Sequence, residues 1–230
     1  MFTEIILISI CGSLLCLDSV FIQAMISRPV VVAPLIGLFL NNIYAGLIIG
    51  ALIELIWIDR LPIGTYIPPN DSIAAVVAIS ITALGGSSLG GVSPELIALG
   101  VLLAIPCGMM AKQMDVMIIR SNDTLSDKAL EDAKENNIKA IERKNYLGLI
   151  KVFSFYAVFL LVVLAILIPS VIWIYPKFNE TLLRALSFTY YFLPLLGIAV
   201  AINMLKLRNT IPIVCAVFLI VVTLLEYFHV

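Results

Sequence analysis

A carboxylate stands inside a long uncharged stretch of this sequence. Glu54 lies in the run IYAGLIIGALIELIWI, residues 43–58. A carboxylate in the middle of a spanning helix costs about 2.5–3.5 kcal/mol on insertion scales, and such residues face a bundle interior or a watery cavity. Gly46 and Gly50, two turns and one turn before Glu54, permit close helix contact that would place it inside the protein. Glu54 therefore either binds a polar ligand or forms an ion pair with Arg28 or Arg60.

Asp18 and Gln23 form a second group of polar residues, at the end of the first apolar run. On a helix, residues five positions apart point about 140° away from each other. One of the pair can therefore line a cavity while the other pairs or caps locally. For Asp18 both a salt bridge and a ligand contact remain open. Arg28, before Pro29, is typical of an interface anchor or a partner for an acid.

A turn interrupts the apolar half of the chain in the segment LPIGTYIPPNDSIAAVVA, residues 61–78. Its prolines and glycine break helix hydrogen bonding and leave backbone amides and carbonyls free. At membrane depth such backbone is tolerated only where it is buried or lines a watery cavity. The free groups would suit a ligand rich in hydroxyls. Asn70, Asp71 or Ser72 would alternatively serve as the cap of the next helix.

The composition indicates that these residues sit in a membrane. Apolar residues make up 62% of the 230 positions and charged residues 13%, with a mean hydropathy of +1.11. Soluble domains average about 45–50% apolar and about 25% charged residues. A net charge of −1 offers no basic face for nucleic acid. The four cysteines lie in apolar runs and His229 is the single histidine, so we expect no metal site, cofactor or catalytic triad.

More than half of the charge is confined to one segment. Residues 112–151 hold fifteen of the twenty-nine charged residues, eight of them basic, and the positive-inside bias places this segment in the cytoplasm. It reads as a helix with Ser126 as a candidate N-cap and Glu135–Lys139 as an i, i+4 pair. The segment is either a weakly amphipathic, solvated helix or a docking surface for a soluble partner.

The charged segment divides the chain into three parts. In residues 1–111 the apolar runs are only 11–16 residues long, broken by charges, prolines and the GGSSLGG loop at 85–91. Such runs predict broken or re-entrant half-helices, the usual pointer to a transporter's binding site. In residues 152–230, three runs (152–175, 188–205 and 211–230) are long enough to span a bilayer. We therefore predict an all-α, multi-pass membrane protein whose site lies in residues 1–111.

Three stretches resemble a known family. LDSVFIQAMISRPVVVAPLIGLFL (residues 17–40), GLIIGALIELIWIDRLPIGTYIPPND (46–71) and AINMLKLRN (201–209) are similar to the membrane IIC subunit of the mannose/sorbose-type phosphotransferase system (PTS). The shared pattern is a Leu-Asp, a Gln, an Arg-Pro, then Glu-Leu and a glycine-containing turn that ends in Pro-Pro. The resemblance covers most of the chain but is weak in the charged segment.

The resemblance implies a function and a set of site residues. It implies a permease component of the bacterial inner membrane that moves a hexose together with a IID subunit, while soluble IIA and IIB proteins carry the phosphoryl group. It also implies that the protein assembles as an oligomer in contact with membrane lipid. Glu54 matches the family's intramembrane glutamate, and Asn70 falls where many members have an aspartate. The expected sugar-binding residues are Glu54, Gln23, Asp18, Gly64, Thr65 and Asn70.

Three other functions are compatible with the residues alone. One is an uncoupled sugar transporter or facilitator of the same fold. Another is a membrane enzyme that uses Glu54 and Asp18 as acid and base, which requires a defined separation between the two carboxylates. The third, a purely structural membrane partner, leaves the insertion cost of Glu54 unexplained.

Overall fold

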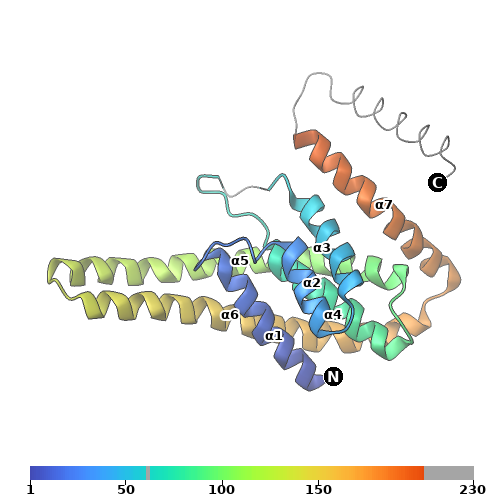
Figure 1. Cartoon of the computed structure of the whole chain (residues 1–230), viewed down its shortest axis with the longest axis horizontal. Helices are drawn as coiled ribbons and strands as arrows, with labels where there is room; N and C mark the ends of the chain where they lie inside the picture. Colours follow the sequence, from blue (N-terminus) through green and yellow to red (C-terminus); the bar gives the residue numbers. More distant parts are fainter. Residues whose placement is uncertain (61–62, 205–230) are drawn as a thin grey trace.

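The computed structural model describes residues 1–60 and 63–204, and every regular element in these residues is a helix (Figure 1). The predicted all-α fold is thereby confirmed for this part of the chain. The predicted last span, residues 211–230, lies outside the described residues. The elements are α1 (Phe2–Cys16), η1 (Leu17–Ser19), α2 (Pro29–Phe39), α3 (Ile43–Trp57), α4 (Asp71–Leu89), α5 (Pro94–Lys134), α6 (Ile138–Ile174), η2 (Tyr175–Lys177) and α7 (Glu180–Met204).

Among the described residues, five helical segments are long and apolar enough to cross a membrane. They contain α1, α4, α5, α6 and α7. The two remaining helices, α2 and α3, have 11 and 15 residues and rise about 16 and 23 Å at 1.5 Å per residue. Because the hydrocarbon core is about 30 Å thick, neither short helix crosses it alone.

Helix α4 occupies the centre of the bundle. It packs against α1, α2, α3, α5 and α6, and all its residues from Ser72 to Gly86 are buried. The expected loop at residues 85–91 was wrong, because α4 continues through it to Leu89. The hydroxyls of Ser87 and Ser88 donate to the Leu84 carbonyl, so they join the helix instead of breaking it. The helix ends at Gly90, whose φ of 94° is readily reached by glycine.

Helices α2 and α3 form a hairpin held together by glycines. A side chain at Gly46 would meet the Ala33 carbonyl oxygen at 2.5 Å, and one at Gly50 would meet the Pro29 carbonyl oxygen at 2.5 Å. The α3 glycines therefore let the two backbones touch, which confirms the close contact predicted from their spacing. This contact brings the start of α2 beside the end of α3, and thus Arg28 beside Glu54.

Helices α5 and α6 form an antiparallel pair that extends far beyond the other helices (Figure 1). With 41 residues, α5 is about 60 Å long, twice the thickness of a bilayer core. The charged segment 112–151 is the outer part of this pair, and we call it the charged hairpin. The two helices run without interruption through the expected boundaries at residues 111 and 151.

Two details predicted for the charged segment were wrong. Ser126 lies inside α5 and is not an N-cap; the helix that follows the turn is α6, capped by Asn137, whose side chain accepts from the Ala140 amide. Glu135 and Lys139 lie on opposite sides of that turn, so they are not an i, i+4 pair of one helix. Strong helix formers on both sides of Ser126 continue α5 to Lys134. The helix ends there, before the turn at Asn136 and Asn137.

Candidate functional site

A cavity of about 600 Å³ opens where several helices meet the loops that connect them. Its size is within the range of small-molecule sites. It lies between the start of α2, the end of α3, the start of α4 and the middle parts of α5 and α6. Its polar lining residues are Ser19, Ser27, Arg28, Glu54, Arg60, Asn70, Asp71, Ser72, Asp115 and Tyr156. Trp57 adds an aromatic ring to the wall. We call this cavity the polar pocket.

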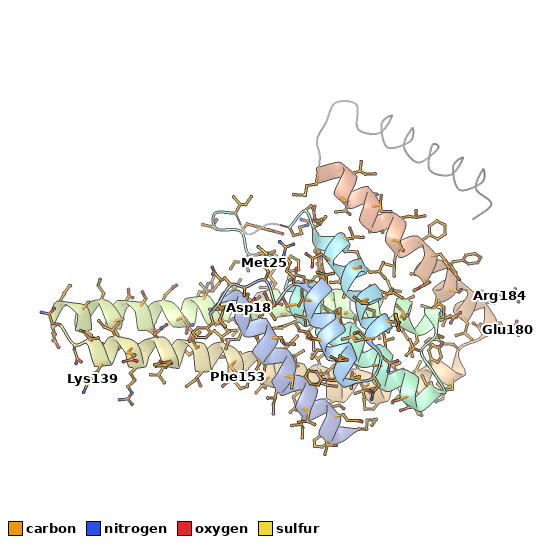
Figure 2. All side chains as sticks on the ribbon, in the orientation of Figure 1. Asp18, Met25, Lys139, Phe153, Glu180 and Arg184 are labelled. Carbon is orange, nitrogen blue, oxygen red and sulfur yellow. The ribbon has the colours of Figure 1, made fainter. Side chains whose placement is uncertain are left out.

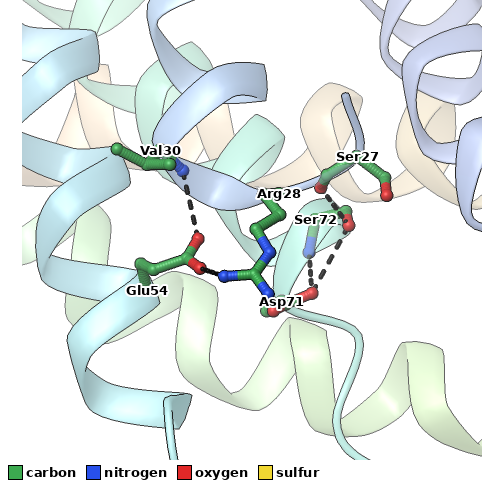
Figure 3. A network of polar contacts seen from close by, with 6 residues as sticks. All are labelled: Ser27, Arg28, Val30, Glu54, Asp71 and Ser72. Atoms are coloured by element: carbon green, nitrogen blue, oxygen red, sulfur yellow. Dashed lines mark hydrogen bonds and ion pairs between the residues drawn. The ribbon is translucent and has the colours of Figure 1, made fainter. Parts of the chain in front are cut away.

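Glu54 and Arg28 form an ion pair on the wall of the polar pocket (Figure 3). The Arg28 guanidinium donates to Glu54 Oε1 at 2.8 Å, and the Val30 amide donates to Glu54 Oε2 at 3.4 Å. The Glu54 side chain is 19% exposed and that of Arg28 is 53% exposed. Because a carboxylate offers about four lone-pair sites, Glu54 keeps acceptor capacity toward the cavity.

The start of α4 forms the next part of the wall. Asp71 Oδ1 accepts from the Ser72 amide at 2.8 Å, and the Ser72 hydroxyl donates to the Ser27 carbonyl at 2.5 Å. The second bond ties α4 to the loop before α2. Figure 3 shows the Asp71–Ser72–Ser27 bonds next to the Glu54–Arg28 pair, and Arg28, Glu54 and Asp71 all line the pocket. Two acids and one base therefore share this side of the pocket.

Asn70, Asp115 and Tyr156 form another part of the wall, with one residue from the loop before α4, one from α5 and one from α6. Asp115 Oδ2 accepts from Asn70 Nδ2 at 3.0 Å, and Asp115 Oδ1 accepts from the Tyr156 hydroxyl at 2.9 Å. Asn70 Oδ1 accepts from the Ile73 amide at 3.0 Å. Asn70 is therefore the cap of α4, as one of the predicted alternatives had it, and it also lines the pocket.

Asp18 organises a loop and does not line the polar pocket. Its side chain is buried, and its carboxylate accepts from the amides of Ala24, Ile26 and Ser27 at 2.8–3.2 Å. Bonds to three amides hold the charge without a salt bridge. Figure 2 shows Asp18 and Met25 on the side of the bundle from which the charged hairpin extends. Asp18 thus shapes the loop that leads into Ser27 and Arg28.

Three other predicted site residues are exposed and lie away from the cavity lining. Gln23 is in the loop held by Asp18, with a φ of 57°, and not on a helix. Gly64, with a φ of 65°, and Thr65 lie on the loop between α3 and α4. The structure therefore brings Glu54 and Asn70 together around one cavity and leaves Asp18, Gln23, Gly64 and Thr65 outside its wall. A role for these four in ligand binding stays a prediction.

Sequence reasoning missed Asp115, Tyr156 and Trp57 as pocket residues. Asp115 was counted with the charged segment, although apolar residues surround it in the run MDVMII, residues 114–119. That pattern is the same signal that identified Glu54, a single carboxylate in an apolar stretch. Tyr156 carried no such signal, because tyrosine is common at membrane interfaces. Within residues 1–60 and 63–204, no group of three metal-binding side chains lies together.

Known proteins similar to this chain share a description. The family model described as the PTS system sorbose-specific IIC component matches residues 2–228. The mannose-specific EIIC component of Escherichia coli (strain K12) is 27% identical over 139 residues, which are 60% of this chain and 49% of that protein. The sorbose-specific EIIC component of Klebsiella pneumoniae is 24% identical over 214 residues, which are 91% and 76% of the two chains. The match to the mannose-specific relative thus spans about half of that protein's length.

Two solved structures share the fold. One, described as a membrane protein, has a TM-score of 0.74 at 19% identity and covers 100% of this chain and 96% of its own. The other, the mannose transporter ManYZ in complex with microcin E492, has a TM-score of 0.64 at 20% identity and covers 95% and 86%. At these identities the likeness concerns the fold. The family model, which spans nearly the whole sequence, shows that this chain belongs to the family of PTS sorbose-specific IIC components.

Proposed function

We propose that this chain is the sugar-conducting IIC component of a phosphotransferase permease and that a hexose binds in the polar pocket. As a member of its family, the chain is a multi-pass protein of the inner membrane. The observation that carries the proposal is the pocket itself. It combines carboxylates, a guanidinium, an amide and a phenol around one cavity, with Trp57 in the wall. Sugars need such a mixture, because each hydroxyl both donates and accepts.

The partners follow from the same proposal. We infer that a IID subunit completes the transporter in the membrane and that soluble IIA and IIB proteins carry the phosphoryl group to the sugar. The structural likeness to ManYZ supports a partner in the membrane. Assembly into an oligomer in contact with lipid belongs to the proposal as well.

Binding of radiolabelled hexoses to the purified chain, alone and with its membrane partner, tests the proposal. We expect saturable binding of at least one hexose, and competition by the unlabelled sugar. Absence of saturable binding to the complex would overturn the proposed function. Uptake by cells with and without the soluble IIB protein then separates a coupled permease from an uncoupled facilitator, because only the coupled permease delivers phosphorylated sugar.

The alternative of a membrane enzyme loses support from the geometry. Its two carboxylates, Glu54 and Asp18, do not share a cavity, because Asp18 bonds three backbone amides outside the pocket wall. Acid–base catalysis needs both groups within reach of one substrate.

The orientation of the charged hairpin is part of the proposal. Its eight basic residues favour the cytoplasm. A cysteine introduced at Glu135, in the exposed turn, should resist a membrane-impermeant thiol reagent applied to intact cells and react after the cells are opened. This site spares the Asn137 cap. Ready labelling of Glu135→Cys in intact cells, above the level of the unmodified chain, would reverse the orientation.

A further inference from the structure

Asp115 is a carboxylate of the polar pocket that takes no part in the Glu54–Arg28 ion pair. Glu54 already holds the Arg28 guanidinium at 2.8 Å, and Asp71 Oδ1 accepts from the Ser72 amide at 2.8 Å, within its own helix. Asp115 instead bonds two neutral groups, the Asn70 amide and the Tyr156 hydroxyl. In the part of the chain that the structure describes, no lysine or arginine forms a salt bridge with it.

The position of Asp115 gives its carboxylate a ligand-facing role. It is partly buried, lines the pocket and is 61 positions from Glu54 in the sequence, on a different helix. Its two bonds use two of about four lone-pair sites, so it can accept further hydrogen bonds. A partly buried carboxylate that lacks a cation gains most from hydroxyl donors, since hydrogen bonds to a charged acceptor are about twice as strong as neutral ones.

We propose that Asp115 binds a hydroxyl of the hexose directly, in the same cavity as Glu54, and that Tyr156 is its positioning residue. The inference rests on the proposed function and adds a second acceptor to it. Tyr156 is buried, and its hydroxyl fixes one Asp115 oxygen, while Asn70 fixes the other. Both remaining lone pairs then face a defined direction. The sugar is thereby held between the α2–α3 hairpin and the α5–α6 pair.

The matched variants are Asp115→Asn, Tyr156→Phe and Asp123→Asn. An asparagine at position 115 can accept from Asn70 and donate to the Tyr156 hydroxyl, which accepts as well as donates, so its neighbours keep their bonds. Asp123 lies exposed on the same helix outside the pocket and controls for the loss of a charge on α5.

The readouts are hexose affinity and the midpoint of thermal unfolding in detergent. We expect Asp115→Asn to weaken hexose affinity by about 10- to 150-fold and to leave the unfolding midpoint unchanged. Tyr156→Phe should weaken hexose affinity by about 2- to 10-fold. The Asp123→Asn variant should bind like the wild type. Equal affinity of the Asp115→Asn variant and the wild type would overturn the proposal while leaving hexose transport intact.

A panel of monodeoxy hexoses, each lacking one hydroxyl, separates a direct contact from an indirect one. If Asp115 accepts from a particular hydroxyl, one analogue binds the wild type weakly and loses nothing further in Asp115→Asn. If every analogue is weakened equally by the substitution, the contact is indirect and the proposal fails. Should Asp115→Asn lower the unfolding midpoint, the same panel of analogues measured on Tyr156→Phe decides whether the contact is direct. A wild type that binds no hexose refutes the proposed function, and this inference with it.

Discussion

The two halves of the α5–α6 pair use charge in opposite ways. Within the bundle, Asp115 is held by two specific neutral partners on the wall of a cavity. In the part of the charged hairpin that extends past the pocket, most charged side chains are exposed, and Lys144 with Asp132 forms an ion pair that bridges the two arms. The same two helices pass through both regions. Burial therefore decides whether a charge has a structural partner or is only solvated.

Glycines differ between the two regions in the same way. Gly46 in the bundle touches the backbone of α2, with a virtual Cβ 2.5 Å from the Ala33 carbonyl oxygen. Gly148 in the charged hairpin has 3.6 Å of space to Asn122 Nδ2, an ordinary van der Waals contact. A side chain is therefore excluded at one position and tolerated at the other.

The largest expected effect belongs to Gly46→Ala. Its methyl group has no room against a backbone that cannot swing aside, so the α2–α3 hairpin must separate, and we expect a loss of about 3 kcal/mol in the free energy of unfolding, the upper end of the usual cost of overpacking. Gly148→Ala should instead be neutral or stabilise α6 by about 0.5–1 kcal/mol. Thermal unfolding of both variants in detergent measures the difference. Equal midpoints would remove the distinction between the two regions.

The second-largest loss of stability is expected for Asp18→Asn. The asparagine has only one oxygen for the three amides that Asp18 satisfies, so at least one buried bond to a charged acceptor is lost. We expect a cost of about 1.5–3 kcal/mol. Hydrogen exchange should speed up at Ala24, Ile26 and Ser27. If their protection matches the wild type, the carboxylate does not order this loop.

Substitutions in the charged hairpin should affect stability least. Lys139 and Arg143 are exposed and four residues apart on α6, near the exposed side chains of Tyr146 and Ile150. If this face docks a soluble phosphotransfer protein, Lys139→Glu with Arg143→Glu should weaken the complex, the more so at low salt. Sugar binding and the unfolding midpoint should stay unchanged. Lys144 is spared because it pairs with Asp132 inside the hairpin.

A pull-down of the IIB protein measures this effect. Arg184→Glu is the control, because Arg184 is exposed at the end of the molecule opposite the hairpin tip (Figure 2). Capture that is insensitive to both the double reversal and salt would leave the hairpin as a solvated helix pair only.

The sequence predicted the fold class, but it identified only part of the lining of the polar pocket, which also includes residues beyond position 111. An apolar composition and the cost of Glu54 are local properties, so the membrane class and one pocket residue could be read directly. The α2–α3 contact followed from the glycine spacing. Asp115 and Tyr156 could not be placed, because their roles depend on which sides of α5 and α6 meet Asn70. Asp18 was ambiguous for a similar reason, since its partners are amides of a non-helical loop.

The extent of α4 and α5 exceeded the prediction for a physical reason. Gly85, Gly86, Ser87 and Ser88 have low helix propensity, yet serine hydroxyl bonds and tertiary packing extend α4 through them. Pro106 likewise lies within α5. Packing inside a bundle outweighs unfavourable helix propensities, which range from a few tenths of a kcal/mol to about 3 kcal/mol per residue.

Hexose affinity of Glu54→Gln, measured together with its detergent-solubilised yield, tests the central claim most directly. The Arg28 side chain is 53% exposed, so losing its partner does not leave a buried charge behind, and the yield should be unchanged. Because hydrogen bonds to a charged acceptor contribute about 1.5–3 kcal/mol, we expect hexose affinity to fall about 10- to 150-fold. Unchanged affinity with a collapsed yield would show that Glu54 serves only to pair with Arg28, and would contradict a sugar site in the polar pocket.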